Sequence, residues 1–415
     1  MSTPKIRFAG FTGDWEQRKL GDVIEDMYNG QTPSRFKDNY WGGEICWLSS
    51  GELNRGTVYQ SKETITVEGQ KSANLRLVPK GTFVMAITGL EAAGTRGNCA
   101  ILGFDTTLNQ SCMALFPNKD LLDTKFLFQW YKLVGERYGI TYTQGTKQQS
   151  YNAEIISDLD ICLPPVNEQQ KIADVLGNLD NLIDLRQRKC EALKKVKKYM
   201  LQKMFPKKGE KVPEIRFAGF TGDWEQRTLG DIAEVKDSAR IPNNEWMESG
   251  VPYIRASDIT NEDLSGFLFI SRDKYEFYKN RTGAPAENDV LFNGGGEIGK
   301  AFLNREASPI YVQGGAVLYV RTSASDYLRG DYLVSYFSTK LAQQYIEVAS
   351  AGGTMKHFTL KPAQNMPVAL PSLEEQKKIG TYFSNLDKLI DVHQRKYDTL
   401  KEIKKYMLQN MFPKK

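Results

Sequence analysis

The stretch EQQKIADVLGNLDNLIDLRQRK runs from Glu168 to Lys189, and a close copy, EQKKIGTYFSNLDKLIDVHQRK, runs from Glu375 to Lys396. In both copies apolar residues recur at heptad spacing, which is typical of a long helix with one apolar seam. The seam residues are Ile172, Leu176, Leu179, Ile183, Leu193 and Met200 in the first copy and Ile379, Phe383, Leu386, Ile390, Leu400 and Met407 in the second. The sequence therefore predicts two helices of about 38 residues, each about 57 Å long at 1.5 Å per residue.

Each seam needs an apolar partner, and the simplest partner is the other copy. Because each helix follows its own globular region, antiparallel pairing gives the chain an internal pseudo-two-fold symmetry. The alternative, in which each helix packs only on its own globular region, remains open. Ser372 and Glu375 form a capping-box pattern at the start of the second helix, and Asn167 is a candidate cap for the first.

A second repeat precedes each globular region. The stretch IRFAGFTGDWEQR occurs at Ile6–Arg18 and again, unchanged, at Ile215–Arg227, so the chain repeats with a period of a little over 200 residues. The aromatic residues of this segment, such as Trp15 and Trp224, fit core or interface positions. The predicted organisation is a first globular domain at 1–163, a central helix at 164–206, a second globular domain at 207–370 and a final helix at 371–415.

The middle of each half is expected to have a mixed α+β fold. Short apolar runs such as EICWLSS and VPYIRAS, GTFVMAIT and NDVLFN, and SCMALF and AVLYV predict equivalent strands in the two halves. Helices are expected at about 124–137 and 327–345. The connecting loops differ: GLEAAGTRGN stands where the second half has GGGEIGKAF, and GTKQQSYNAE where it has GGTMKHFTLK. We therefore expect two similar domains that meet different ligands.

Composition disfavours several classes of protein. The 415 residues include five cysteines without CxxC spacing and two histidines, so a zinc site or a histidine-dependent triad repeated in both halves is not expected. No apolar run approaches the roughly 20 residues of a membrane span, and we expect a cytoplasmic protein. The net charge of +5 is compatible with nucleic acid but does not decide it.

Several of these segments are familiar. The openings FxGFxGxWExxxLGD, the WxxSxxL and YIRASDI strands, and above all the helix entries LPPxxEQxxI and LPSxxEQxxI resemble specificity subunits of type I restriction-modification enzymes. The resemblance covers essentially the whole chain, in duplicate.

The resemblance implies a non-catalytic subunit that binds double-stranded DNA. In that family each target-recognition domain reads one half of a split, asymmetric site, and two antiparallel coiled-coil helices set the unread gap. The helices also dock two modification subunits, which carry S-adenosylmethionine and methylate adenine, and restriction subunits supply ATP- and Mg-dependent cleavage. No cofactor, metal or catalytic residue is expected in this chain.

One glycine-rich stretch needs separate consideration. In FNGGGEIGKA, residues 292–301, the spacing of Gly294, Gly299 and Lys300 fits a P-loop, but Ala301 stands where the magnesium-binding Ser or Thr is required. The same glycines fit the FxGxG of methyltransferases, yet no NPPY-like tetrapeptide is present to receive an adenine. We interpret the stretch as a turn from which Asn293 and Lys300 approach DNA.

Contacts to DNA require basic and amide side chains on exposed loops. The candidates in the first domain are Gln31, Thr32, Ser34, Arg35, Lys37, Arg96, Thr146, Lys147, Gln148 and Gln149. The candidates in the second domain are Arg240, Asn243, Arg255, Asn293, Lys300, Lys356 and His357.

Two other functions remain open at this point. One is a stand-alone DNA-modifying enzyme, which the failed motifs above disfavour. The other is a coiled-coil scaffold that displays two domains to a partner other than DNA.

Overall fold

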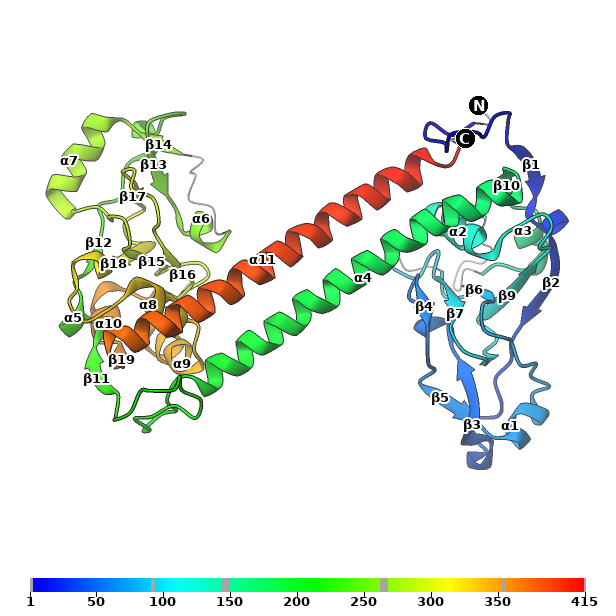
Figure 1. Cartoon of the computed structure of the whole chain (residues 1–415), viewed down its shortest axis with the longest axis horizontal. Coiled ribbons are helices and arrows are strands. Elements are labelled where there is room, and N and C mark those ends of the chain that lie inside the picture. The colour runs from blue at the N-terminus through cyan, green and yellow to red at the C-terminus, as the bar shows by residue number, and fades with distance from the viewer. Residues whose placement is uncertain (1–2, 91–93, 143–149, 262–267, 353–355, 414–415) are drawn as a thin grey trace. The chain divides into compact units, whose positions relative to one another are not determined.

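The computed structural model describes residues 3–90, 94–142, 150–261, 268–352 and 356–413. The chain divides into two compact units, residues 1–187 with 395–415, and residues 188–394. Two long helices, α4 (Val166–Lys203) and α11 (Leu373–Asn410), each contribute residues to both units. Both have the 38 residues that the heptad pattern predicts (Figure 1).

The first unit is built on two small mixed sheets and one antiparallel strand pair. The larger sheet has the strand order β2-β9-β6-β7-β4, the smaller one β5-β3-β8, and β1 pairs with β10. The strands are β1 (Glu16–Lys19), β2 (Ile24–Asn29), β3 (Trp41–Leu48), β4 (Thr57–Val58), β5 (Glu63–Ile65), β6 (Phe83–Ala86), β7 (Cys99–Leu102), β8 (Thr107–Leu108), β9 (Cys112–Pro117) and β10 (Asp160–Leu163). The helices before α4 are α1 (Val67–Ser72), α2 (Thr124–Thr141) and α3 (Ala153–Ser157).

The second unit repeats this plan. Its sheets have the orders β12-β18-β15-β16 and β14-β13-β17, and β11 pairs with β19. The strands are β11 (Glu225–Thr228), β12 (Val235–Asp237), β13 (Val251–Ile254), β14 (Phe269–Ile270), β15 (Val290–Asn293), β16 (Ala301–Leu303), β17 (Tyr311–Val312), β18 (Val317–Val320) and β19 (Pro367–Leu370). The helices are α5 (Leu229–Ile232), α6 (Ala256–Thr260), α7 (Arg272–Thr282), α8 (Gly330–Phe337), α9 (Lys340–Ala349) and α10 (Leu360–Gln364).

The strand predictions are confirmed in both halves, and so is the mixed α and β character. The helix predicted at about 327–345 is in fact two helices, α8 and α9. The chain breaks between them because the Thr339 hydroxyl accepts a hydrogen bond from the backbone N–H of Ala342 at 3.2 Å and so caps a new helix. No helix among the described residues is long and apolar enough to cross a bilayer.

Most seam residues of both long helices pack against the two globular cores. Near the starts of the helices, Ile172 and Leu176 are buried in the first core, and Ile379, Phe383 and Leu386 in the second. Leu179 and Met407 are partly buried against the first core, and Leu193 and Met200 against the second. Ile183, Ile390 and Leu400 are half-buried. Each globular core therefore includes the first turns of the helix that follows it.

Within each unit the two helix segments run antiparallel. In the first unit Lys404 on α11 donates a hydrogen bond to Asp180 on α4. In the second, Lys197 on α4 donates to Asp387 on α11, and the Cys190 Sγ lies 3.4 Å from the Gln394 Oε1. Residue numbers rise on one helix as they fall on the other, so the predicted antiparallel direction is confirmed inside each unit.

The end of each long helix closes the core of one unit. In the first unit Phe412 packs against Trp15 and Phe126, with ring centroids 6.1 and 5.2 Å apart. In the second, Phe205 packs against Trp224 and Tyr332 at 6.1 and 5.6 Å. These contacts explain why Trp15 and Trp224 belong to the repeated segments, because they complete the same aromatic cluster in both units.

The repeated arginine and glutamate residues form a buried ion pair in each unit. The Arg7 guanidinium donates to both carboxylate oxygens of Glu168 at 2.7 and 2.8 Å, and Arg216 does the same to Glu375. The two glutamates are 0% and 1% exposed. Bidentate pairing satisfies carboxylates that would otherwise be costly to bury.

The glutamine of the EQ motif holds the start of a core helix. The Gln169 Oε1 accepts from the N–H of Asp123 at 2.9 Å, just before α2, while its Nε2 donates to the carbonyls of Leu121 and Pro164. Gln376 accepts from the N–H of Arg329, just before α8, at 3.0 Å. The duplicated LPxxxEQ motif is therefore a packing device that joins each long helix to its domain.

One capping prediction is borne out in part and the other is wrong. The Ser372 hydroxyl accepts from the N–H of Glu375 at 3.4 Å, as a helix cap does, and the Glu375 carboxylate binds Arg216. Asn167 is not a cap, because α4 already begins at Val166 and the Pro165 carbonyl accepts from the N–H of Glu168 at 2.8 Å.

Candidate nucleic-acid interface

The first unit gathers several loops at one end of β2, β9 and β6, three neighbouring strands of its larger sheet. The N–H of Gln31 donates to the Leu108 carbonyl at 3.0 Å, and the Thr32 hydroxyl contacts the Gln110 side chain. The N–H of Ile87 donates to the Ser111 carbonyl, and the N–H of Tyr151 donates to the Ile87 carbonyl at 2.8 Å. We call this row, from 31–32 through 110–111 and 87–88 to 150–151, the first reading edge.

The second unit has an equivalent edge. Gly294 donates to the Ala316 carbonyl at 2.9 Å and accepts from the N–H of Phe358 at 2.8 Å, as Ile87 does with Ser111 and Tyr151. His357 pairs with Ala351, and a side chain added at Gly295 would meet the His357 ring at 3.3 Å. We call 294–295, 316 and 356–358 the second reading edge. The same backbone frame therefore carries different side chains in the two units.

The first-domain candidates fall into three groups. Gln31, Thr32, Ser34, Arg35 and Lys37 lie on the loop that starts at the first reading edge. Arg96 lies elsewhere, with its side chain stem against α2 at Gly139. Thr146, Lys147, Gln148 and Gln149 lie outside the described residues, although Ser150, next to them, is on the edge.

Arg35 and Lys37 are already engaged within the unit. Arg35 is paired with Glu63, and its guanidinium lies 3.7 Å from the centre of the Trp41 ring. Pairing raises the pKa of Arg35 and lowers that of Glu63. Lys37 donates to the Tyr40 hydroxyl at 2.9 Å. In this structure both cations therefore hold the loop together.

The second-domain candidates also separate. Arg240 and Asn243 are exposed on the loop before β13. Arg255 binds the Asp258 carboxylate at 2.9 and 3.2 Å, which raises its pKa and fixes the start of α6. Lys356 and His357 are exposed at the second reading edge, and Lys300 is half-buried at the end of the β15–β16 turn.

Asn293 requires a correction. Its side chain is 0% exposed, and its Nδ2 donates to the Ala256 carbonyl and the Thr260 hydroxyl, both at 3.0 Å. The amide therefore joins β15 to α6 inside the domain, and we remove Asn293 from the DNA-contact candidates. Sequence reasoning missed this because the two partners are more than 30 residues away along the chain.

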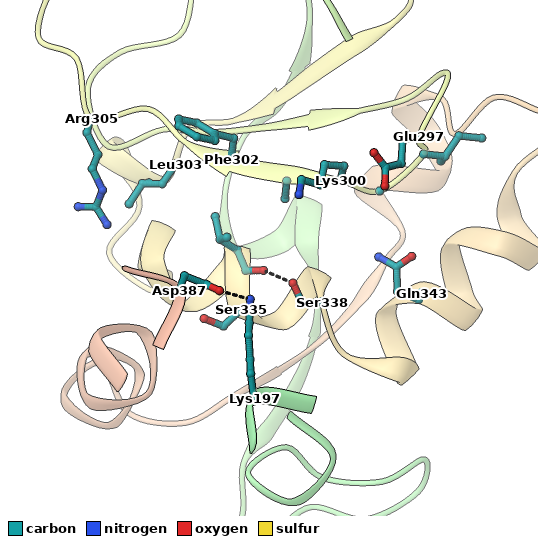
Figure 2. Close-up of a pocket in the computed structure, with 14 residues that line it drawn as sticks. Lys197, Glu297, Lys300, Phe302, Leu303, Arg305, Ser335, Ser338, Gln343 and Asp387 are labelled. Atoms are coloured by element: carbon teal, nitrogen blue, oxygen red, sulfur yellow. Dashed lines mark hydrogen bonds and ion pairs between the residues drawn. The ribbon is translucent and has the colours of Figure 1, made fainter. Parts of the chain in front are cut away.

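The second unit also holds a polar cavity that the sequence did not predict. The cavity has a volume of about 420 Å³. Figure 2 shows the Lys197–Asp387 pair, Ser335 and Ser338 on one side of it and Lys300 on the other. Arg305 lies at one end, where its guanidinium is 3.4 Å from the Ser384 hydroxyl. The cavity adds basic side chains beside the loop that carries Lys300.

The first unit has larger polar side chains at two of the equivalent positions. Phe126 and Tyr332 are equivalent residues, because each packs on the tryptophan of the repeated segment. Three and six positions later the first unit has Gln129 and Lys132, and the second unit has Ser335 and Ser338. The Lys132 ammonium lies 3.1 Å from both Asp180 oxygens, and Gln129 donates to Asp180 at 2.9 Å. At these two positions the first unit therefore has a partly buried charge cluster where the second unit has two serines.

We expect this cluster to make the stability of the first unit depend on pH. Burial, together with the nearby Lys132, lowers the pKa of Lys404 to about 8, against the opposing effect of Asp180. Because the unfolded chain then binds more protons than the folded one between about pH 8 and 10.5, the free energy of unfolding should rise with pH across that window.

Between pH 7.5 and pH 10 we expect the free energy of unfolding of wild type to rise by roughly 1–3 kcal/mol more than that of Lys404→Met. Urea unfolding of both proteins at the two pH values measures the difference. Parallel changes in wild type and variant would contradict a depressed pKa at Lys404.

Exposed apolar side chains on the long helices recur in pairs that are 207 positions apart. Leu182 matches Leu389, Leu185 matches Val392, Val196 matches Ile403 and Tyr199 matches Tyr406, with exposures of 40% to 60%. The first unit therefore carries Leu182, Leu185, Ile403 and Tyr406, and the second Leu389, Val392, Val196 and Tyr199. We call each set of four the repeated patch; the heptad analysis missed it because these residues lie off the seam.

The described residues show no group of three or more His, Cys, Asp or Glu placed to hold a metal ion. Burial raises the pKa of the Cys99 thiol to about 12 and raises that of Cys112 as well. These two thiols therefore stay protonated near neutral pH and pack as apolar side chains.

Comparison with known families decides the identity of this fold. The model of the type I restriction modification DNA specificity domain matches the chain twice, at residues 12–195 and 221–402. The chain belongs to this family. Each match of the specificity-domain model spans one globular domain and most of the long helix that follows it.

Relatives of this specificity-domain protein span nearly its whole length. It is 24% identical over 416 residues to the type I restriction enzyme MjaIX specificity subunit of Methanocaldococcus jannaschii, covering 96% of this chain and 92% of that one. It is 25% identical over 409 residues to the MjaVIII specificity subunit of the same organism, with 95% and 91% covered.

A solved structure has the same fold. The S subunit of the type I restriction-modification system from M. genitalium matches with a TM-score of 0.68 over 100% of both chains, at 17% sequence identity. The expectation from the helix-entry motifs and the duplicated plan is therefore confirmed at the level of family and fold.

Proposed function

We propose that this chain is the DNA-recognition subunit of a type I restriction-modification complex. Each globular domain reads one half of a split, asymmetric site in double-stranded DNA, and the long helices set the unread gap. The observation that carries the proposal is the pair of reading edges, which share one backbone frame and present different side chains. Equivalent frames with different polar groups suit a reader of two different base sequences.

The proposed chemistry lies in the partners. Two modification subunits supply S-adenosylmethionine and methylate adenine, and restriction subunits supply ATP- and Mg-dependent cleavage. In this proposal the chain itself binds no cofactor. The family relatives, which are specificity subunits, support recognition over the alternatives of a stand-alone enzyme or a scaffold for a non-DNA partner.

The repeated patch supports the docking of two copies of one partner. Exposed apolar side chains that gather on one surface often mark a protein interface. In the antiparallel register fixed by Asp180 and Lys404, Leu182 and Tyr406 lie about 6 Å apart along the helix axis. The contact between Lys197 and Asp387 places Tyr199 and Leu389 in the same relation in the second unit. Two patches of similar apolar side chains fit two copies of one partner.

We expect Leu389→Glu with Tyr199→Glu to remove one of the two modification subunits. The charges replace half-exposed apolar groups, so the fold should be retained while an apolar interface would bury uncompensated carboxylates. Mass measurement of the purified complex should change from two modification subunits per chain to one.

The matched variant in the first unit, Leu182→Glu with Tyr406→Glu, should also remove one modification subunit. The variant with all four substitutions should remove both. A complex that keeps two modification subunits in all three variants would show that the repeated patch is not the docking surface. Mapping of N6-methyladenine in cells that express the chain with its modification subunit tests the recognition function itself.

A further inference from the structure

The loop that leaves the first reading edge is fixed on both sides of one residue, Phe36. Before it, the indole N–H groups of Trp41 and Trp47 donate to the carbonyls of Ser34 at 3.1 Å and Gln31 at 3.0 Å. Arg35 is stacked on Trp41 and paired with Glu63, and Lys37 is bound to the Tyr40 hydroxyl. The backbone around Phe36 is therefore held by its neighbours.

Phe36 itself has no such contact. Its side chain is 99% exposed, although burying a phenylalanine is worth about 1.5–3 kcal/mol. A single exposed apolar residue needs no explanation by itself. Here the side chains on both sides of the ring, Arg35 and Lys37, are engaged within the unit, whereas the ring itself is exposed.

The second unit shows that the fold does not impose this exposure. Arg35, Phe36 and Trp41 match Arg240, Ile241 and Trp246, and a short 3-10 turn precedes the tryptophan in both units. Ile241 is 1% exposed and packs in the core beside Tyr253. The same loop frame therefore buries its apolar residue in one unit and projects it in the other.

The position of the loop indicates what the ring meets. The loop joins the first reading edge through the backbone of Gln31 and the side chain of Thr32, and it leads into β3 (Figure 1). Lys37 follows the ring and keeps its charge beside the neutral Tyr40 hydroxyl, whereas Glu63 balances the charge of Arg35. A surface that is negative outside and apolar within fits this combination, and duplex DNA has phosphates outside and stacked bases within.

We propose that Phe36 is a wedge that inserts at a base step of the half-site read by the first domain and partly unstacks it. This inference rests on the proposed function and adds to it one residue and its mode of contact. Ile241 makes no such contact, so the two half-sites are bound differently: the first is deformed at one step, and the second is not deformed by an equivalent residue.

The test uses the chain assembled with its modification subunits and duplexes that carry 2-aminopurine at successive positions of each half-site. Apart from the adenines on which the modification subunits act, wild type should raise the fluorescence at one step of the first half-site, because unstacking relieves quenching. Phe36→Ala should abolish that rise and weaken binding about tenfold, while Phe36→Trp should keep both. The salt dependence of binding should not change, because no phosphate contact is lost.

Several outcomes would overturn the wedge. Phe36→Ala should melt at the same temperature as wild type, because the ring is fully exposed. Unchanged affinity and fluorescence in this folded variant would therefore refute the contact. Loss of modification subunits from the Phe36→Ala complex would place the ring against a protein surface instead. If wild type bound no split site at all, the proposed function would fail first, and the wedge with it.

Discussion

Exchange of residues 24–162 for the corresponding segment of another specificity subunit is expected to replace one half of the recognised sequence and leave the other half and the gap unchanged. The exchanged segment contains the whole first reading edge, from Gln31 to Tyr151. It leaves in place Arg7 and Glu168, and also Trp15 and Phe412, which close the unit. The frame is therefore kept while the reading groups change.

Sequencing of methylated sites in cells that carry the exchanged chain measures the result. Methylation at the original site should fall to background, because both half-sites are needed, and a new site with one familiar half should appear. The matched exchange of residues 233–369 should change the other half only. A single exchange that altered both halves would mean that one domain does not read one half-site.

Glu375→Ala is expected to lower the free energy of unfolding of the second unit by about 3–5 kcal/mol, because it leaves the Arg216 guanidinium partly buried without its carboxylate. The loss should be local, since Arg216, Glu375 and their neighbours all belong to that unit. Hydrogen exchange should accelerate in β11 and β19, which pair beside the helix start.

Two matched variants sharpen this prediction. Glu168→Ala should have the same effect on β1 and β10 of the first unit, where Arg7 is the partner. Replacing both partners, as in Arg216→Met with Glu375→Leu, should recover much of the stability, because no charge is then buried alone. Equal protection in Glu375→Ala and wild type would show that the ion pair does not stabilise the unit.

Local periodicity was enough to predict the elements that depend on local sequence. Heptad spacing gave both 38-residue helices, and alternating apolar runs gave the main strands. The alignment of the two variable middles also holds, since Ile87 and Gly294 make equivalent backbone contacts. These features depend on patterns that a single segment carries.

Features that join distant segments were not predictable. Nothing in the helix pattern indicates that Phe205 and Phe412 fill aromatic clusters, because their partners lie far away in the chain. Arg35 seemed a free basic residue, yet Glu63 is its partner. Arg255 is different: Asp258 follows three residues later, a spacing from which the pairing could have been predicted.

The central claim is that this chain specifies a split DNA site, and the most direct test is a genome-wide map of N6-methyladenine. Cells that express the chain with its modification subunit are compared with cells that express the modification subunit alone. The account predicts new methylation at one motif, with two short and different blocks separated by a fixed unread gap. New methylation at an undivided motif, or none from an assembled complex, would contradict it.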